Sequence, residues 1–435
     1  AIAAARAAFG SWAARTAFER SALMRAVADA CERRRDDLAR VLTLDQGKPL
    51  HAEAYEEVAE LIVFWRQAAE DCVRLEGAVP EAQQPGRRVM LLRRPLGVVG
   101  VITPWNWPYT MPAEIVAPAL ACGNTVTWTP APSTAVCSGV LAECIAEADL
   151  PPGVCNFVLG PGPEVGDELA ANPGTQAVGF IGSTRTGLSV ARRAAGKAQL
   201  LEMGGNGPLV VMHDADVEAA AEAAVVGCFL GAGQSCSAAE RLLVHEAVHD
   251  EFVERFAERV RREVRLGDPF DEATTLGPVN NVPTAAKMDA HVSDARERGA
   301  GVIAGGRRAE GFPTDLYWPA TVLDDVPRES TAVTEETFGP IAPIVPIRSL
   351  EDAIEQANAL DYGLMSAIFT RDLAAGLRYA DQVRMGLVNV NETTNYWEAH
   401  LPWGGRAGTA SGIGRAGGRY PMETLTELQT VTFGL

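Results

Sequence analysis

The sequence predicts an α/β protein with a parallel, doubly wound sheet in one domain and a second α/β domain after it. From Gly97 onward, short β-branched or apolar runs alternate with helical segments, a rhythm that is typical of parallel sheets. The same alternation resumes after a helical segment at 217–230. A chain of 435 residues is also long enough for two or three domains with large cores.

The beginning of the chain is predicted to be helical. Apolar residues recur at helical spacing in three segments, 3–12, 17–42 and 53–72. The Gly and Pro within 45–49 end one helix before the next begins. Residues 87–94 alternate as a strand does, and the Pro85-Gly86 turn before them suggests a hairpin that leaves the body of the domain.

Later strands and helices alternate in two groups. In the first group we expect strands at 98–103, 125–128, 155–159 and 177–181, and helices at 111–121, 133–148, 164–171 and from 187. In the second we expect helices at 217–230, 250–264, 283–298, 350–359 and 373–382, and strands at 241–245, 301–303, 342–347 and 386–390. Ligands of such sheets bind beyond the carboxyl ends of the strands, beside the helix N-termini.

Composition narrows the class of protein. A hydrophobic content of 47% with 22% charged residues is that of a globular protein, and the net charge of −18 argues against nucleic acid and anionic membranes as partners. No apolar run is long enough to span a bilayer. The 8 cysteines are scattered without metal-ligand spacing, so we expect no metal site and a cytoplasmic protein. The chain opens inside an alanine-rich helical pattern without a signal peptide, and we expect a further segment before it.

One cysteine stands in a setting that favours chemistry. Cys236 lies within 231–237, among small residues, two glycines and a glutamine. Small neighbours leave the sulfur approachable, and a thiol reacts as its thiolate when access and local dipoles allow it. Taken alone, this motif favours the alternative that the cysteine is a small buried hydrophobe, as most free cysteines are.

Four other motifs each allow a functional and a structural interpretation. Residues 182–187 follow a strand and open a helix, which suits phosphate binding or an ordinary helix cap. In 201–205 a glutamate precedes two glycines, as a general base or a surface turn would. Residues 104–108 hold Asn106 between prolines and tryptophans. The Asn106 amide could donate a hydrogen bond to an oxyanion, or the loop could serve only for packing. Residues 335–340 contain two adjacent carboxylates and an aromatic ring. The carboxylates could bind ribose hydroxyls, or the segment could be a solvated turn.

The order of these motifs resolves the alternatives. Asn106, Gly182, Glu202, Cys236 and Glu336 follow one another as the catalytic and cofactor motifs of the aldehyde dehydrogenase superfamily do, and the chain resembles that family over essentially its whole length. The tail motifs 402–405, 411–415 and 426–431, and the stretch 45–49 near the start, resemble the family as well.

The resemblance implies a domain organisation. Residues 1–76 and 96–205 would form a Rossmann-like dinucleotide-binding domain, and 206–406 the second, catalytic α/β domain. Residues 77–95 and 420–435 would form a small β element for oligomerisation. Family members are usually homodimers or homotetramers, so we expect one of these states.

The resemblance also implies a mechanism. The Cys236 thiolate would attack the aldehyde, the Asn106 amide and the Cys236 N–H would hold the oxyanion, and Glu202 would activate water to hydrolyse the thioester to an acid. Glu202 favours this hydrolysis over acyl transfer to coenzyme A, although a CoA-acylating semialdehyde dehydrogenase and an inactive binding or structural homologue stay as alternatives. The implied cofactor contacts are Ile102, Thr103, Pro104, Trp105, Thr129, Gly162, Gly166, Gly182, Ser183, Gly187, Met203, Gly204, Glu336 and Phe338.

Several positions depart from the family pattern. The lysine and glutamate that usually hold the adenosine ribose are replaced by Thr129 and Pro132. Because no other cation stands in 131–135, we expect NAD, while NADP is not excluded. Ile115 replaces a lysine of hydrolytic members, and the tail between Gly405 and Ser411 is two residues longer than usual.

The matching positions of the family's substrate tunnel are rich in indoles. They are Trp107, Met111, Leu230, Trp397 and Trp403, with Tyr109 and Tyr396 nearby. Such walls favour an apolar or aromatic aldehyde, and the lack of an arginine among them argues against the semialdehyde of a diacid. The alternative is that some of these tryptophans only pack an interface.

Overall fold

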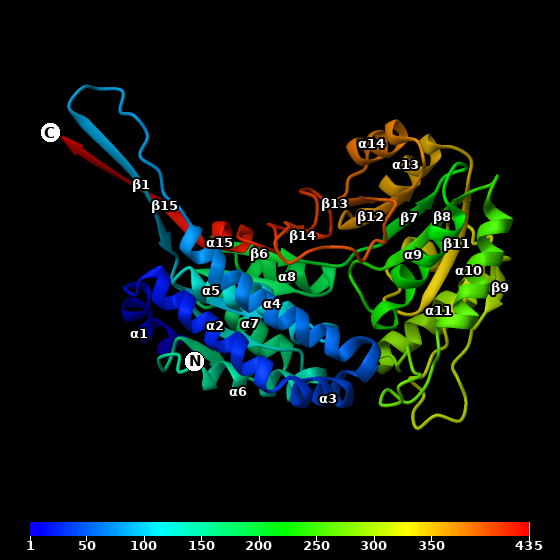
Figure 1. Ribbon diagram of the computed structural model, residues 1–435, viewed down its shortest axis with the longest axis horizontal. Helices are drawn as coiled ribbons and strands as arrows, with labels where there is room; N and C mark the ends of the chain where they lie inside the picture. The colour runs from blue at the N-terminus through cyan, green and yellow to red at the C-terminus, as the bar shows by residue number, and fades with distance from the viewer. Residues whose placement is uncertain (435) are drawn as a thin grey trace.

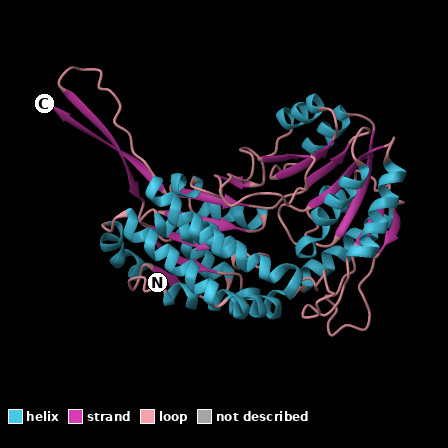
Figure 2. Cartoon of the chain, in the orientation of Figure 1, coloured by secondary structure: helices cyan, strands magenta, loops and turns pink. Residues whose placement is uncertain are grey.

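The computed structural model describes residues 1–434 and consists of two α/β bodies and a projecting β-ribbon (Figures 1 and 2). Helices cover the sheet of the N-terminal body, shown in blue and cyan, while the green and orange body holds the second sheet (Figure 1). Within these residues, no helix is both long and apolar enough to cross a membrane. The predicted α/β class with parallel sheets is confirmed.

The first sheet has the strand order β14-β6-β5-β2-β3-β4. Its parallel strands are β2 (Val98–Ile102), β3 (Thr125–Thr129), β4 (Cys155–Phe157), β5 (Ala177–Ile181) and β6 (Ala198–Glu202). The short β14 (Gly412–Ile413) joins the edge antiparallel to β6, pairing Gly412 with Glu202. The carboxyl ends of β2, β5 and β6 therefore lead directly into the loops that carry Asn106, Gly182 and Glu202.

Eight helices accompany this sheet: α1 (Ile2–Ala13), α2 (Ala17–Arg33), α3 (Arg35–Gln46), α4 (Tyr55–Asp71), α5 (Thr110–Ala121), α6 (Ala135–Glu147), α7 (Asp167–Ala171) and α8 (Thr184–Arg193). The single helix expected at 17–42 is wrong, because the chain breaks at Arg34 (φ −104°, ψ 19°). Arg34 donates to Asp37 and to Glu143 of α6 from this break, so its side chain ties the turn to a neighbouring helix.

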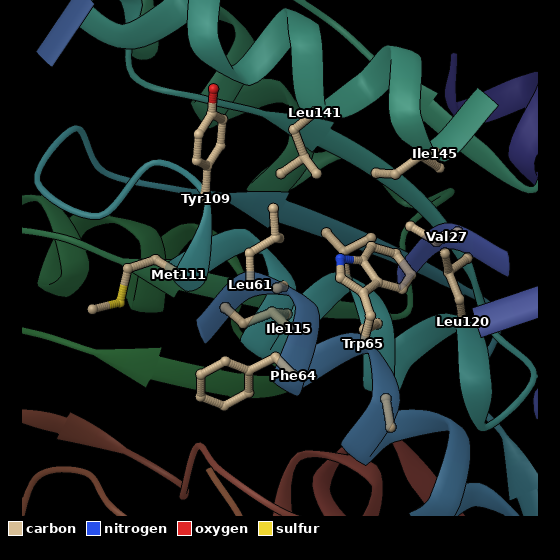
Figure 3. Close-up of a cluster of buried hydrophobic side chains, with 14 of the residues drawn as sticks. Val27, Leu61, Phe64, Trp65, Tyr109, Met111, Ile115, Leu120, Leu141 and Ile145 are labelled. Carbon is tan, nitrogen blue, oxygen red and sulfur yellow. The ribbon is translucent and has the colours of Figure 1, made fainter. Parts of the chain in front are cut away.

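The core beneath the site lies between α4 and α5. Figure 3 shows Leu61 and Trp65 of α4 among Ile115 and Leu120 of α5, and all four are buried. Burying each such side chain stabilises the fold by about 1.5–3 kcal/mol. This packing fixes the position of α5, whose first turn presents Met111 to the substrate pocket.

The second sheet has the order β13-β12-β7-β8-β11-β10-β9. The strands are β7 (Gly207–Val211), β8 (Ala239–His245), β9 (Gly301–Ala304), β10 (Thr321–Asp324), β11 (Ile341–Ile347), β12 (Met365–Phe369) and β13 (Leu387–Val390), all parallel except β9. Its helices are α9 (Val217–Phe229), α10 (His249–Glu263), α11 (Val282–Glu297), α12 (Thr331–Thr334), α13 (Leu350–Asn358) and α14 (Leu373–Gln382).

The ribbon joins two distant parts of the chain. Strand β1 (Arg87–Pro95) pairs antiparallel with β15 (Thr426–Gly434), which follows α15 (Tyr420–Thr424). The hairpin expected near 77–95 is therefore wrong in its pairing, since residues 77–86 contribute only the bridge of Ala78 with Leu91. Pro80 and Pro85 cannot donate to a strand ladder, which accounts for the loop in this stretch. The ribbon extends away from both bodies (Figure 1).

Candidate active site

The cysteine loop is held in an unusual backbone conformation. Gly231, Ala232 and Gly233 all have positive φ, of 62°, 56° and 67°. A Cβ at position 233 would lie 2.3 Å from the carbonyl oxygen of Gly339, so only glycine fits there. Gln234 locks the turn, because its Nε2 donates to the Gly231 carbonyl over 2.9 Å and its Oε1 accepts from the Asn280 N–H over 2.8 Å.

The glycines after Glu202 allow this loop to approach. A Cβ on Gly205 would lie 2.1 Å from the carbonyl oxygen of Cys236, and one on Gly204 would lie 2.7 Å from the Glu336 carboxylate. The glutamate-glycine-glycine sequence therefore brings Glu202, Cys236 and Glu336 into one buried cluster. The structural interpretation of 201–205 as a surface turn is wrong, because Glu202 is only 4% exposed.

The C-terminal segment holds Glu202 in place. The Ser411 carbonyl accepts from the Met203 N–H over 3.1 Å, and the Ser411 hydroxyl donates to the Gly204 carbonyl over 2.7 Å. The Gly182 N–H donates to the Glu202 carbonyl over 3.1 Å. Hydrogen bonds from Ser411 and Gly182 thus fix the backbone at the end of β6. None of these bonds uses the Glu202 carboxyl group.

Glu202 and Cys236 each shift the pKa of the other. Burial, opposed by the neighbouring Cys236 thiol and reinforced by the Glu336 charge, raises the pKa of Glu202 to about 8. Burial also raises the pKa of Cys236 well above its usual value, and the Glu202 charge adds to the effect. The isolated site therefore holds a protonated thiol beside a carboxyl group that titrates near neutrality, a pair suited to moving one proton.

Glu336 is fixed at the other side of the cluster. Its Oε1 accepts from the Gly205 N–H over 2.8 Å, and its carbonyl accepts from Lys287 Nζ over 2.9 Å. Phe338, with φ of 57°, is held because the buried Glu240 carboxylate accepts from its N–H over 2.8 Å. Its ring meets Trp105 edge to face with the centroids 5.4 Å apart.

Two cavities meet at this cluster, and within residues 1–434 Cys236 is the one residue that lines both. The larger is a cleft of about 390 Å³ between the two bodies. It is lined by Pro104, Trp105, Asn106, Ile181, Gly182, Ser183, Arg185, Glu202, Gly204, Cys236, Asn281, Pro283, Thr284, Lys287, Glu336 and Phe338.

The residues of this cleft fit a dinucleotide. Gly182 and Ser183 open α8, whose first N–H groups and dipole attract phosphate. Arg185 and Lys287 add positive charge, and the Glu336 carboxylate offers acceptors for ribose hydroxyls. A Cβ on Gly182 would lie 2.8 Å from the Phe180 ring, so the residue just before the α8 cap Ser183 has to be a glycine without a side chain.

The smaller cavity opens on the opposite side of Cys236. All five predicted pocket residues line it, so the structure brings Trp107, Met111, Leu230, Trp397 and Trp403 together; the rest of the lining is Glu60, Ser235, Ser237, Met365 and Asn395. Tyr109 turns away, since its hydroxyl donates to the Leu38 carbonyl, and Tyr396 is 44% exposed.

Seven predicted cofactor residues lie outside the lining of the larger cleft: Ile102, Thr103, Thr129, Gly162, Gly166, Gly187 and Met203. Thr103 accepts from Trp128 Nε1 over 2.8 Å, so its hydroxyl is occupied. A Cβ on Gly187 would lie 2.3 Å from Met203 Sδ, which gives these two residues a packing role. Thr129 is buried, and its hydroxyl has no hydrogen-bond partner among the described residues.

Sequence reasoning missed Glu60, Lys287 and Glu240. Glu60 belongs to a run of acids at the start of α4, and only the packing of α4 on α5 reveals which of them faces the pocket. Lys287 was visible as one of only 3 lysines, but nothing in the sequence joins α11 to the loop of Glu336. Glu240 lies in a strand whose other residues are mostly apolar, and a buried acid in such a strand signals a bonding role.

A cysteine between a cleft whose lining fits a dinucleotide and an indole-lined pocket, on two parallel sheets, is the arrangement of a dinucleotide-dependent oxidoreductase. Comparison with known families narrows the class. The model of the aldehyde dehydrogenase family matches residues 1–431, and the chain belongs to that family. The protein is an NAD(P)-dependent aldehyde dehydrogenase, which oxidises an aldehyde to the acid.

Named relatives and solved structures support this assignment. The chain is 38% identical to the succinate-semialdehyde dehydrogenase [NADP(+)] GabD of Escherichia coli K12, over all of this chain (100%) and 89% of that protein. It matches the crystal structure of succinate-semialdehyde dehydrogenase from Burkholderia pseudomallei with TM-score 0.97 and 34% identity, covering 100% of this chain and 89% of that one. It matches an NAD-dependent aldehyde dehydrogenase from Sinorhizobium meliloti with TM-score 0.96 and 36% identity, covering 100% and 86%.

Proposed function

We propose that the protein oxidises an apolar or aromatic aldehyde by covalent catalysis at Cys236 and hydrolyses the resulting thioester. The observation that carries this proposal is that Cys236 lines both cavities. An aldehyde entering through the indole-lined pocket would present its carbonyl carbon to the sulfur. The opposite face of the same carbon would then look into the dinucleotide cleft.

The Cys236 proton leaves through Glu202. Glu202 lies beside the Cys236 thiol in the buried cluster, so its carboxylate can accept the proton as sulfur bonds to the carbonyl carbon. Asn106 is buried and lines the same cleft as Cys236, where its amide can donate to the developing oxyanion. A nicotinamide dinucleotide bound in the cleft would accept the hydride that leaves this carbon.

Glu202 also serves the second half of the reaction. Once Glu202 has released the thiol's proton to solvent, its carboxylate can take a proton from water and so promote attack on the thioester. The carboxylic acid is then released and the thiol restored. Transfer to coenzyme A needs no such base, so we place the CoA-acylating reaction second.

The pocket supports an aldehyde without a carboxylate tail. Its lining holds three indoles and two methionines, and no lysine, arginine or histidine among residues 1–434. Two of the proteins named above are succinate-semialdehyde dehydrogenases, and the carboxylate of succinate semialdehyde would need a cation. The nearest lysine, Lys48, lies over the Trp107 ring and pairs with Glu57.

For the cofactor we propose a preference for NAD over NADP. Thr129 and the turn Pro132–Thr134 place no positive charge where a 2′-phosphate would lie by the family's pattern.

Steady-state oxidation of hexanal, benzaldehyde and succinic semialdehyde, each with NAD and NADP, tests these proposals. We expect the highest kcat/KM for benzaldehyde or hexanal with NAD, and a free acid as product. A preference for the semialdehyde would overturn the substrate class, and acyl-CoA formed in the presence of coenzyme A would overturn the hydrolytic step. Cys236→Ala is the control for background oxidation.

We also propose that the β1–β15 ribbon mediates homo-oligomerisation. A two-stranded ribbon that projects from the body is marginal alone, and it exposes Leu428 and Phe433 by 55% and 45%. A chain truncated after residue 425 should change from a dimer or tetramer to a monomer in light scattering. An unchanged mass would refute this role.

A further inference from the structure

The substrate pocket contains one carboxylate, and its position is unexpected among indoles. Glu60 of α4 lines the cavity together with Trp107, Trp397 and Trp403. It accepts one hydrogen bond, from Thr110 Oγ1 over 3.3 Å, and among residues 1–434 no basic side chain forms a salt bridge with it. A half-buried carboxylate without a salt-bridge partner costs stability, so a role in binding is the natural reason to keep one.

The indoles beside Glu60 form a partial cage. The centroids of Trp397 and Trp403 lie 6.3 Å apart with their planes tilted by 30°, and Phe64 backs Trp397 over 5.5 Å. Indole faces attract cations, most strongly where water is excluded. Trp107 already shows this behaviour, because Lys48 Nζ lies 3.5 Å from the centroid of its ring.

Most other ionisable side chains near the pocket are carboxyl groups. Glu114 is one helical turn beyond Met111 on α5, is buried, and has no hydrogen-bond partner for either carboxylate oxygen within residues 1–434. Glu202 adjoins Cys236 in the larger cleft, and Glu398, which follows Trp397 in the chain, lies 3.3 Å from His400. Lys48, the cation closest to the indoles, is neutralised by Glu57.

We propose that this pocket selects aldehydes whose tail ends in an alkylated ammonium group, with Glu60 facing the cation and the three indoles surrounding its methyl groups. The inference rests on the proposed function and narrows its substrate class. The apolar walls remove water from the methyl groups, while Glu60 supplies the charge that a neutral tail would not use. A carboxylate tail would meet Glu60 instead and be repelled.

The ionisation of Glu60 is consistent with such a ligand. Burial raises the pKa of Glu60 to about 7, and the neighbouring Glu57 raises it further, while Lys48 and Thr110 lower it. A cation bound beside the carboxyl group would favour its ionised form.

A pair of isosteric aldehydes isolates the charge. Betaine aldehyde and 3,3-dimethylbutanal have the same shape and differ in a quaternary nitrogen against a quaternary carbon. We expect kcat/KM to be at least about tenfold higher for the charged aldehyde, a typical size for a desolvated cation–π contact with a nearby carboxylate. In Glu60→Gln this ratio should fall about tenfold, whereas in Glu70→Gln, an exposed acid on the same helix, it should stay unchanged.

The outcomes separate the two proposals. Oxidation of 3,3-dimethylbutanal without a preference for betaine aldehyde, or a ratio that Glu60→Gln leaves unchanged, overturns the cation site while the proposed function stands. Oxidation of no aldehyde at all overturns both. If Glu60→Gln fails to fold, inhibition of the unaltered enzyme decides: choline should inhibit at least about tenfold more strongly than its neutral isostere 3,3-dimethylbutan-1-ol, and equal inhibition overturns the inference.

Discussion

Replacing Glu202 with glutamine should stabilise the protein while it destroys turnover. Glu202 is buried, and burial raises its pKa from 4.5 to about 8. The folded state therefore holds a proton on this carboxyl group over a pH range in which the unfolded chain has released it. Glutamine has nearly the same shape and no proton to lose, so the variant escapes this dependence on pH.

The sign and size follow from proton linkage. Because the folded pKa is raised, stability is complete below the unfolded pKa near 4.5 and falls as the pH rises toward about 8. Each pH unit within this window costs about 1.4 kcal/mol, so the cost at pH 7 is about 3 kcal/mol. Between pH 5.5 and 7.5 the stability difference between Glu202→Gln and the unaltered protein should grow by about 2 kcal/mol.

Urea denaturation followed by tryptophan fluorescence at both pH values measures this difference. A buried acid whose raised pKa does not involve Glu202, such as Glu240, contributes equally to both proteins and cancels. Glu70→Gln, an exposed acid on α4, is the control and should show no growing difference. A difference between Glu202→Gln and the unaltered protein that stays constant with pH would refute the assignment of a raised pKa to Glu202.

Three further predictions concern the same site and its support. Cys236→Ala should abolish turnover and change the dinucleotide Kd less than about threefold in a fluorescence titration, since the sulfur contributes little apolar area; retained turnover would refute the nucleophile. The acyl-enzyme should accumulate in Glu202→Gln and be visible by mass spectrometry, and slow turnover without an adduct would contradict the role of the base. Lys48→Met should lower the free energy of unfolding by about 3–5 kcal/mol because it leaves Glu57 buried without its ion-pair partner; a loss of less than about 1 kcal/mol would refute a stabilising role for this ion pair.

The elements that sequence alone predicted are those with a strong local signal. Helix α14 (Leu373–Gln382) was predicted with its observed bounds, because apolar periodicity and the Asp372 cap agree. Strands β7 and β12 were missed. Each is a five-residue apolar segment buried on both sides, and such a run lacks the alternation that identifies a half-exposed strand.

The parts of the site that sequence could not supply come from distant contacts. Cys236, Glu202 and Asn106 each sit in a motif whose residues are adjacent in the chain, so each motif could be recognised without a fold. The pairing of β1 with β15 and the contact of Lys287 with Glu336 join segments that no local rule connects. Likewise, Glu60 lines the smaller cavity only because that face of α4 packs toward it, and the sequence does not show which face does so.

This distinction explains why family membership leaves the substrate open. The catalytic cluster depends on glycines at which a side chain would collide with Cys236 or Glu336, so a working cysteine loop constrains those positions tightly. The pocket walls come from α4, α5 and the loop around Trp397, where one side chain can replace another without disturbing the loop. A chain 38% identical to a semialdehyde dehydrogenase can therefore keep the reaction and reverse the charge of the tail that it accepts. Glu60 is the residue on which that reversal depends, and the isosteric aldehydes measure its effect directly.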